Sequence, residues 1–368
     1  MGGSAAADSG AAAASEVAVA RPASASEVVD WNELVAANPG GGEVWAGEEY
    51  LEAKRHGRYL PRRVMVDRPG RSALAVGVLA KRVPVLGEWW HLPAGPPGED
   101  LRAVLEATTA VGELARRHGA FMLKIEPRLP AGAAADRALR ATGAIPSVRI
   151  VPNPSTVLVD VTGTEQELFA RLGKKARNSI TRAARDGIEV RRVPASDENC
   201  AAFSRLLRET ADGRFVLREE RYYREFWQRF EHAGNGQLFF ATSGGELVAG
   251  AFAIVLGDKT TYKDGASLRE KRAYGASHAL QWEVLRWANE RGARVHDLCG
   301  APPSDRADDP GHPLHGVGRF KRSFQSETTD YVGAFDVPLK PAAYRAWASL
   351  GDRLARRWSL AVRKDPYY

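Results

Sequence analysis

The residues with the clearest chemical potential are the cations near the middle of the chain. Between Arg171 and Arg192 there are eight basic residues and only two acidic ones. Thr164 and Glu167 have the spacing of a capping box, so we expect a helix to begin there and to continue through Gly173. At about 100° per residue, one side of this helix is apolar and the other presents a strip of positive charge.

A cationic strip of this kind fits more than one role. A solvated helix face is the ordinary explanation for a run of charge, and an amphipathic helix can also lie on a membrane surface. The apolar side holds mainly Leu, Ala and Ile, which favours packing on the domain. The charged side would then face a polyanion such as RNA phosphates, a pyrophosphate or anionic lipid headgroups. The candidate phosphate-binding residues are Lys174, Lys175, Arg177, Arg182 and Arg185.

A second group of polar residues lies in a stretch rich in Pro and Gly. It contains Asp305, Asp308, Asp309, His312 and His315. No neighbouring strand or helix is predicted to fix these side chains as metal ligands, so we expect a substrate-covering loop and no metal ion. The sequence has no Gly-x-Ser-x-Gly elbow and no Walker-type loop, which argues against a serine hydrolase and a nucleoside triphosphatase. We expect no cofactor.

The elements that position these residues belong to a chain of 368 residues, long enough for about two domains. The net charge of +7 is moderate, so the location of the charge matters more than its amount. The two cysteines, Cys200 and Cys299, exclude a disulfide framework and fit a reducing, cytoplasmic location. No apolar run approaches the ~18 residues that span a bilayer.

Residues 1–27 consist almost entirely of Ala, Ser, Gly and small polar residues. They lack the basic start and the apolar centre of a signal peptide, so we expect a disordered tail.

The rest of the chain carries the same order of strand and helix signals twice. In each half, three short strands joined by Gly-containing turns precede a helix and then one more strand. The first half has strands over 63–67, 73–81 and 89–92, a helix over 99–118 and a strand over 121–125. The second half has strands over 237–241, 247–256 and 260–263, a helix over 277–291 and a strand over 295–298. This order predicts an α+β protein of two similar domains, consistent with an old duplication.

Several motifs, in this order along the chain, resemble the FemABX family of peptidoglycan-precursor aminoacyltransferases. They are Gly95-Pro96, Lys124-Ile125-Glu126-Pro127, the run from Lys174 to Ile188, Tyr262-Lys263-Asp264-Gly265-Ala266-Ser267, Leu280-Gln281-Trp282, Trp287-Ala288, Asp297 with Gly300, and Gly318-Arg319-Phe320-Lys321-Arg322-Ser323-Phe324. The resemblance implies two GNAT-like acyltransferase domains, which agrees with the repeated order of elements. Residues 28–161 together with 333–368 would form domain 1, and residues 162–332 would form domain 2. No heptad run occurs between Arg185 and Gln237, so we expect no coiled-coil arm.

The function implied by the resemblance is aminoacyl transfer in building the interpeptide bridge of peptidoglycan. An amino acid (Gly, Ala or Ser) would move from aminoacyl-tRNA to the stem-peptide side-chain amine of lipid II or UDP-MurNAc-pentapeptide. The cationic strip would then contact the tRNA. We expect a cytoplasmic monomer that also contacts the inner face of the membrane.

Site residues follow from the same resemblance. Aminolysis of an ester passes through a tetrahedral oxyanion, which a nearby cation stabilises. Phe320 and Lys321 match a Phe-Lys pair of the family, so a catalytic role is implied, with Lys321 at the oxyanion or the tRNA end. Arg218 and Tyr222 match a pair that binds the pyrophosphate of the precursor, and their spacing of four would place both on one helix face. Lys54 occupies the place of a domain 1 lysine with the same role.

Two motifs depart from the pattern of the family. In the family, a second tyrosine often stands two residues after the tyrosine that matches Tyr262, but this chain has Asp264 there. Glu126 stands where the family often has an aspartate. We expect these three residues to contact substrate and to alter the choice of acceptor or amino acid.

Three other functions stay open. The same transfer chemistry could serve secondary metabolism or resistance. An acyl-CoA-dependent GNAT enzyme would need a Gly-rich pyrophosphate loop at the start of a helix, which is not found. An RNA- or envelope-binding module would use the cationic strip alone.

Overall fold

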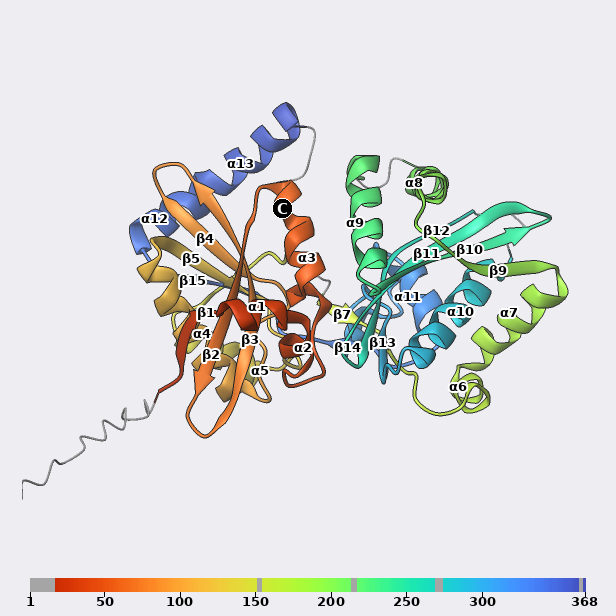
Figure 1. The fold of residues 1–368 in the computed structure, drawn as a ribbon, viewed down its shortest axis with the longest axis horizontal. Helices are drawn as coiled ribbons and strands as arrows, with labels where there is room; N and C mark the ends of the chain where they lie inside the picture. Colours follow the sequence, from red (N-terminus) through yellow and green to blue (C-terminus); the bar gives the residue numbers. More distant parts are fainter. Residues whose placement is uncertain (1–16, 151–153, 213–216, 269–273, 364–366) are drawn as a thin grey trace, which may run out of the picture.

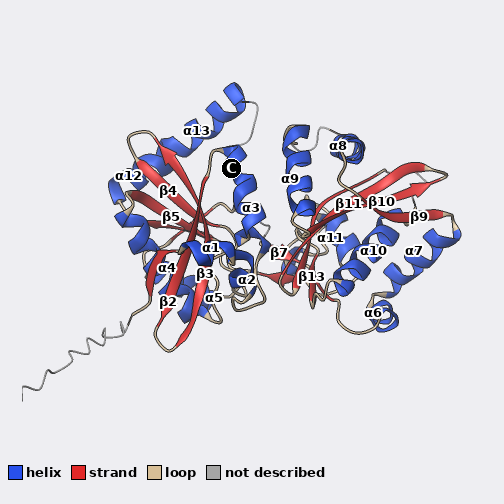
Figure 2. Ribbon diagram, viewed as in Figure 1, coloured by secondary structure: helices blue, strands red, loops and turns tan. Residues whose placement is uncertain are grey.

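The computed structural model describes residues 17–150, 154–212, 217–268, 274–363 and 367–368. They form two lobes that lie side by side, each built on one β-sheet with helices packed against it (Figures 1 and 2). Among the described residues, no helix is both long and apolar enough to span a bilayer.

The first lobe contains a seven-stranded sheet in the order β1-β2-β3-β4-β5-β15-β6. Its strands are β1 (Val19–Pro22), β2 (Leu60–Arg68), β3 (Arg71–Val83), β4 (Gly87–Leu92), β5 (Ala120–Ile125), β15 (Ala334–Pro338) and β6 (Ile145–Ser147). Only β4 and β5 run parallel, and α4 (Leu101–Arg117) connects them. Asp100 caps the start of α4 by accepting from the N–H of Ala103, and Gly119 follows its end with a left-handed φ of 81°.

The second lobe repeats this plan in a six-stranded sheet, ordered β8-β13-β12-β11-β10-β9. Its strands are β8 (Leu158–Asp160), β13 (Val295–Asp297), β12 (Lys259–Ser267), β11 (Glu246–Leu256), β10 (Gly236–Ser243) and β9 (Ile188–Val193). Again one neighbouring pair, β12 and β13, is parallel, and α10 (Ala276–Glu290) connects it. The predicted α+β class and the twofold order of elements are therefore confirmed.

The remaining helices cover the sheets and the connections between them. They are α1 (Ala25–Val29), α2 (Trp31–Ala36), η1 (Val44–Ala46), α3 (Glu48–Ala53), η2 (Lys54–Gly57), α5 (Ala133–Ala141), α6 (Glu165–Arg171), α7 (Lys174–Arg185), α8 (Asp197–Ala211), α9 (Glu220–His232), η4 (Ser304–Arg306), α11 (His315–Lys321), α12 (Pro341–Ala346), η5 (Trp347–Gly351), α13 (Asp352–Trp358) and η6 (Ser359–Arg363). In the second lobe, α8 and α9 cover one face of the sheet and α7 and α10 the other (Figure 1). The alternation along β10 explains this, because Leu238 packs towards α9 and Phe239 towards α10.

The chain passes between the lobes twice, and the two crossings pair with each other. β7 (Ser155–Thr156) and β14 (Thr329–Asp330) form a two-stranded antiparallel ribbon between the sheets (Figure 1). After the second crossing, β15 returns to the first sheet beside β5. After the first crossing, β8 pairs with β13 and so belongs to the second sheet. The second lobe therefore begins a few residues before position 162, where the sequence analysis expected domain 2 to start.

The expected disordered tail over 1–27 is wrong for the part that the structure describes. β1 pairs with β2, and the small side chain of Ala20 is buried on the first sheet. Ser24 and Glu27 form a capping box at the start of α1. Alanine gives only a weak hydrophobic pattern, which hides a strand, but the Ser-x-x-Glu spacing was a signal for the helix.

The cationic segment is two helices and not one. The capping box of Thr164 and Glu167 begins α6 as expected, but Gly173 is extended and separates α6 from α7. A Cβ at Gly173 would lie 2.4 Å from the carbonyl oxygen of Ser323, and the N–H of Gly173 donates to the carbonyl of Phe324 at 3.1 Å. The helix breaks because the chain must approach the end of α11 more closely than a side chain allows.

The two lobes share one hydrophobic core. Trp31 and Tyr50 of the first lobe belong to the same buried cluster as Phe226, Phe230 and Phe252 of the second. Aromatic side chains bury large areas, so this cluster contributes strongly to holding the lobes together.

A chain of buried ions crosses the same interface. Glu43 accepts from Lys259 at 2.5 Å and lies 3.6 Å from Arg128, which in turn lies 3.4 Å from Asp297. Glu43 and Arg128 come from the first lobe, and Lys259 and Asp297 come from the second. Two of these three contacts, Lys259 with Glu43 and Arg128 with Asp297, join the lobes, so the set of ion pairs is complete only when both lobes are in place.

We expect Glu43→Gln to lower the free energy of unfolding by about 3 kcal/mol, because it leaves Arg128 and Lys259 buried without a shared counter-charge. Urea denaturation measures the effect. The matched control is Asp136→Asn, which removes an exposed ion pair with Arg140 and should change stability by about 0.5 kcal/mol or less. Equal effects of the two substitutions would contradict the structural role of the buried ions.

Candidate functional site

A cavity of about 390 Å³ opens between the two lobes. Residues from both lobes line it: Trp45, Tyr50, Lys54, Arg149, Ile150, Pro154, Arg218, Tyr222, Tyr223, Lys263, Asp264 and Cys299. The lining contains four cations and one carboxylate, so the cavity is suited to an anionic ligand.

The structure brings together three residues that the sequence singled out. Lys54 follows α3 in the first lobe, Tyr222 lies in the first turn of α9 in the second lobe, and Arg218 lies shortly before α9; all three line the cavity. The guanidinium carbon of Arg218 lies 4.8 Å from the centre of the Tyr222 ring, and Nζ of Lys54 lies 5.1 Å from that of Tyr50. Aromatic faces therefore support both cations.

The expected placement of Arg218 on a helix is wrong. α9 begins only at Glu220, so Arg218 lies in the loop before it. Its guanidinium nevertheless reaches the cavity, where it also donates to the main-chain carbonyl of Tyr368. The last described residues of the chain thus reach the cavity as well.

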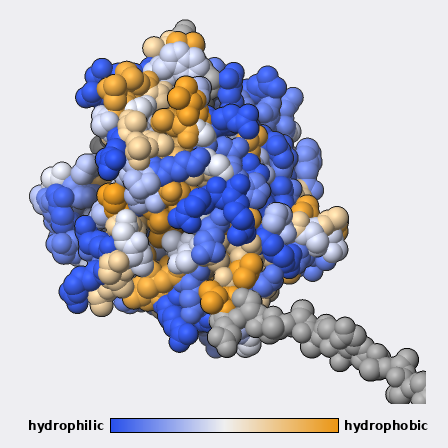
Figure 3. All heavy atoms as spheres, turned by 90° about the vertical axis from the view of Figure 1, so that its left-hand side faces the viewer, coloured by the Kyte–Doolittle hydropathy of each residue, from blue (hydrophilic) through white to orange (hydrophobic). Residues whose placement is uncertain are grey.

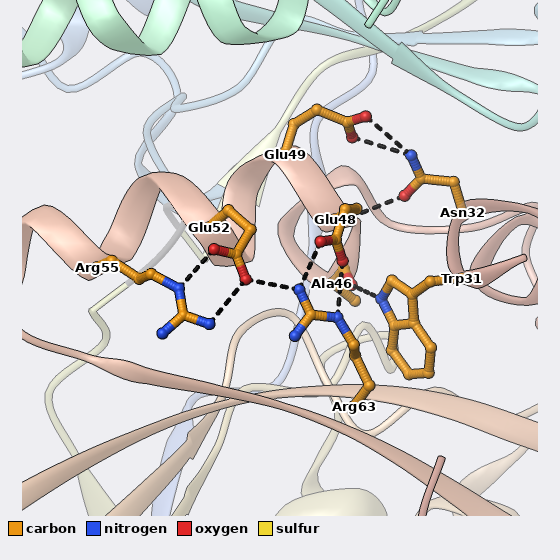
Figure 4. Close-up of polar contacts among 8 residues, drawn as sticks. All are labelled: Trp31, Asn32, Ala46, Glu48, Glu49, Glu52, Arg55 and Arg63. Atoms are coloured by element: carbon orange, nitrogen blue, oxygen red, sulfur yellow. Dashed lines mark hydrogen bonds and ion pairs between the residues drawn. The ribbon is translucent and has the colours of Figure 1, made fainter. Parts of the chain in front are cut away.

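Polar contacts hold α3, the helix directly before Lys54, in place (Figure 4). Arg63 of β2 donates to Glu48 and to Glu52, each at 2.7 Å. Asn32 accepts from the main-chain N–H of Glu48 at 2.8 Å. These bonds fix the rotation of α3 and so the direction in which Lys54 leaves its end.

An irregularity in β12 brings two neighbouring side chains to the cavity. Opposite β11 the register shifts, so that Asp264 pairs with Phe252 and Tyr262 with Ala253 while Lys263 is the extra residue. Side chains of consecutive residues normally point to opposite faces, but at a bulge both can reach one side. Lys263 and Asp264 both line the cavity, with Nζ and Oδ1 3.0 Å apart.

The charges of the cavity shift one another's protonation. Burial lowers the pKa of Lys54, and the nearby cations Arg218 and Lys263 lower it further. For Tyr222, burial alone would raise the pKa, but Lys54, Lys263 and Arg218 outweigh it and the pKa falls below its ordinary value. Repulsion among like charges is relieved when an anion binds, so these shifts favour an anionic ligand.

Arg149 also lines the cavity, and the sequence analysis missed it. Its guanidinium donates to the carbonyl of Val332 at 2.6 Å, and burial lowers its pKa to about 10. It lies in the crossing between the lobes, where no periodic pattern or motif marks it.

Glu126 and Tyr262 lie near the cavity but are not among its lining residues. Glu126 is fully buried and accepts from the main-chain N–H of Ile150 at 2.5 Å, which holds that part of the wall in place. Tyr262 faces inward from β12, and Nζ of Lys321 lies 5.9 Å from its ring centre.

Phe320 and Lys321 point in different directions from α11. Phe320 packs on the rings of His278 and Phe324, with centres 4.9 and 5.3 Å apart. Lys321 is buried, and its ammonium donates to the carbonyls of Cys299 at 2.8 Å and Gly300 at 2.9 Å. Because Cys299 lines the cavity, Lys321 lies directly behind its wall.

A second, open basin of about 490 Å³ lies on the other side of α11. It is lined by Gly173, Lys174, Lys175, Asp308, His315, Arg319, Arg322 and Ser323. Two of the predicted phosphate-binding residues, Lys174 and Lys175, therefore lie beside Arg319 of α11 and Arg322 directly after it, to which the sequence analysis assigned no phosphate contact. The spacing of Arg319 and Arg322, three residues apart on a helix, was the signal available.

The other cations of α7 do not line the basin. Arg182 pairs with Asp186 at 3.2 Å and lies over the ring of Tyr274 at 4.3 Å. Arg185 is exposed, and Arg177 is half-buried.

The loop that the sequence marked as acidic and histidine-rich runs beside this basin. Arg322 donates to Asp308 at 2.7 Å, and Arg306 to Asp309 at 2.6 Å. Within the described ranges, no group of three or more His, Cys, Asp or Glu side chains is arranged to hold a metal ion.

Comparison with known proteins agrees with this architecture. Residues 171–322 match the model of an acetyltransferase (GNAT) domain. The lipid II:glycine glycyltransferase of Staphylococcus epidermidis is 21% identical over 391 residues, which cover 86% of this chain and 92% of that protein. The enzyme of the same name from Staphylococcus aureus strain MRSA252 is 22% identical over 88% of this chain and 94% of its own length.

Among solved structures, a crystal structure of FemX superimposes with a TM-score of 0.75 at 18% sequence identity. The match covers 89% of this chain and 99% of the FemX chain. The resemblance to the FemABX family seen in the sequence is thereby confirmed, and the chain has the fold of FemX and contains a GNAT-type acyltransferase domain.

Proposed function

We propose that this enzyme transfers an aminoacyl group from aminoacyl-tRNA to the stem-peptide amine of a peptidoglycan precursor. The names of its relatives support glycine as the transferred residue and lipid II as the acceptor. Ala and Ser as donors, and UDP-MurNAc-pentapeptide as acceptor, are the other versions of the same proposal.

The observation that carries this proposal is the cationic cavity. Lys54, Arg218 and Lys263 surround one space with a single carboxylate, Asp264, among them. A pyrophosphate linked to a sugar offers several oxygens for guanidinium and ammonium groups, and Tyr222 adds a phenol donor. The precursor would therefore bind here by its pyrophosphate, with its peptide extending along the wall formed by Cys299.

The chemical step needs a cation near the ester carbonyl. The acceptor amine attacks this carbon, a tetrahedral oxyanion forms, and the C–O bond to the tRNA ribose breaks. The amine loses a proton and the leaving ribose oxygen gains one, directly or through the substrates. Lys321 has three ammonium protons and donates to two carbonyls among the described residues, which holds its charge in a fixed position for the oxyanion.

The donor tRNA would lie against the basin on the other side of α11. Lys174 and Lys175 stand at the N-terminal end of α7, and Arg319 faces them. Phosphate groups are attracted both by these side chains and by the free N–H groups of the helix start. α11 separates the two openings, so Lys321 would lie where the donor and acceptor meet.

The transfer itself is tested by incubating the protein with lipid II, tRNA, synthetase and glycine, and weighing the product. We expect a mass gain of one glycyl unit that disappears on treatment with RNase. Acetylation from acetyl-CoA alone would overturn the proposal in favour of an ordinary GNAT activity. RNA binding without any product would leave a binding module instead.

We expect Arg218→Ala to lower kcat/KM for the acceptor about 10- to 100-fold, mainly through KM, because one charge-assisted contact to phosphate is lost. Steady-state kinetics with varied acceptor measures it. Arg221→Ala is the matched control, since Arg221 lies nearby on α9, is exposed and pairs with Glu225. A similar rise of KM in both variants would argue against a specific phosphate contact.

We expect Lys321→Ala to lower kcat about 10²- to 10³-fold with little change in KM for either substrate. Burial lowers the pKa of Lys321, so the protonated form, and activity with it, is lost at a lower pH than for an ordinary lysine. In Lys321→Arg the guanidinium stays charged, so the alkaline fall in kcat should move to higher pH. An unchanged alkaline profile in that variant would show that Lys321 is not the group that titrates.

A further inference from the structure

The C-terminal helical segment, from α12 through η6, has an unusual outward surface. Its inner side is anchored on the first lobe by Tyr344, Trp347 and Ser359, all buried. Large apolar side chains instead face outward from Leu350 onwards. They are Leu350, Leu354, Trp358 and Val362, between 48% and 62% exposed. We call these four residues the apolar strip.

Single exposed apolar side chains are common, but a row of them along one helix indicates a contact surface. Leu350, Leu354 and Trp358 are four residues apart, so they lie on the same side of the segment. The strip holds four of the fifteen exposed large apolar side chains found among the described residues. Figure 3 looks onto the side where α12 and α13 lie, and hydrophobic residues gather near its top among hydrophilic ones.

The charges beside the apolar strip are of one sign. Arg345, Arg353 and Arg357 are exposed. The segment from Pro341 to Arg363 contains one acidic residue, Asp352, which is paired with Arg356 at 2.9 Å. A helix with leucines and a tryptophan next to arginines, and little unpaired negative charge, matches the surface of an anionic lipid bilayer.

The position of the segment also fits a membrane. In Figure 1, α13 rises on the same side of the molecule as the end of α3 and the start of α9, which carry Lys54 and Tyr222. Tyr368, which lies five residues beyond the segment, accepts from Arg218 at the cavity. A bilayer lying on the apolar strip would therefore be near the opening of the cationic cavity.

We propose that the apolar strip and its flanking arginines form an interfacial anchor that binds the surface of anionic membranes. The tryptophan ring and the leucines enter the headgroup region while Arg353 and Arg357 contact lipid phosphates. The further role of the anchor, to present the cavity to lipid-linked precursor, rests on the proposed function. Membrane binding itself does not.

Sedimentation with vesicles tests the anchor. The full chain should bind vesicles of equal parts phosphatidylglycerol and phosphatidylcholine, and bind pure phosphatidylcholine at least about tenfold more weakly. The double variant Leu354→Asp/Trp358→Asp should lose binding about tenfold or more, and Arg353→Glu/Arg357→Glu should do the same on the anionic vesicles only. Absence of binding by the unaltered protein would overturn the proposal.

A matched control introduces the same charges at exposed apolar positions elsewhere. Val29→Asp/Val85→Asp alters side chains that are 84% and 104% exposed and should leave vesicle binding unchanged. Thermal melts establish that all variants are folded. Equal loss in this control would overturn the proposal, as would a concentration-dependent dimer that dissociates in Leu354→Asp/Trp358→Asp, since the strip would then cover a second copy.

Transfer assays separate the anchor from the catalytic function. The strip variant should keep transfer to the soluble UDP-MurNAc-pentapeptide but lose about tenfold or more with lipid II in vesicles. Equal activity of the variant and the unaltered protein on vesicles would overturn the presenting role. If the unaltered protein transfers nothing to either acceptor, the proposed function fails while vesicle binding still decides on the anchor.

Discussion

Four charged side chains meet between the two lobes, alternating in sign from Lys259 through Glu43 and Arg128 to Asp297. Each lobe supplies one cation and one carboxylate, and the pairs Lys259–Glu43 and Arg128–Asp297 join the lobes. The hydration that these ions lose is compensated only while their geometry is kept. The cavity takes its walls from both lobes, and the distances across it therefore depend on this contact and on the shared aromatic core.

Between the two lobes, the cavity brings several cations together, and their mutual repulsion is relieved when an anionic ligand binds. Lys54, Arg218 and Lys263 repel one another, and the aromatic rings beside Lys54 and Arg218 relieve only part of this repulsion. Arg63 holds α3 in place, and the bulge in β12 directs Lys263 to the cavity. The cations therefore lie close together before an anion binds, which reduces the reorganisation that binding requires.

Much of the fold was predictable from local patterns. Short strand signals and Gly-containing turns marked four strands of each sheet, and α4 and α10 lie close to their predicted ranges. The family motifs pointed to Lys54, Arg218 and Tyr222, which the structure places around one cavity. Two predictions failed for identifiable reasons. The strand β1 contains small alanines, which give a weak hydrophobic pattern. Gly173 ends a helix because it lies against Ser323, a residue far along the sequence.

The sequence by itself determined that three strands, a helix and one more strand occur in this order twice, and where positive charge is dense. These properties depend on side-chain periodicity and on residues close together in the chain. Only the tertiary structure decided which cations act together. Arg149 joins the cavity, Arg319 and Arg322 face Lys174, and Phe320 turns away from Lys321 because distant segments pack against them. Contacts of this kind depend on how the lobes and helices pack together, and local sequence patterns do not encode that packing.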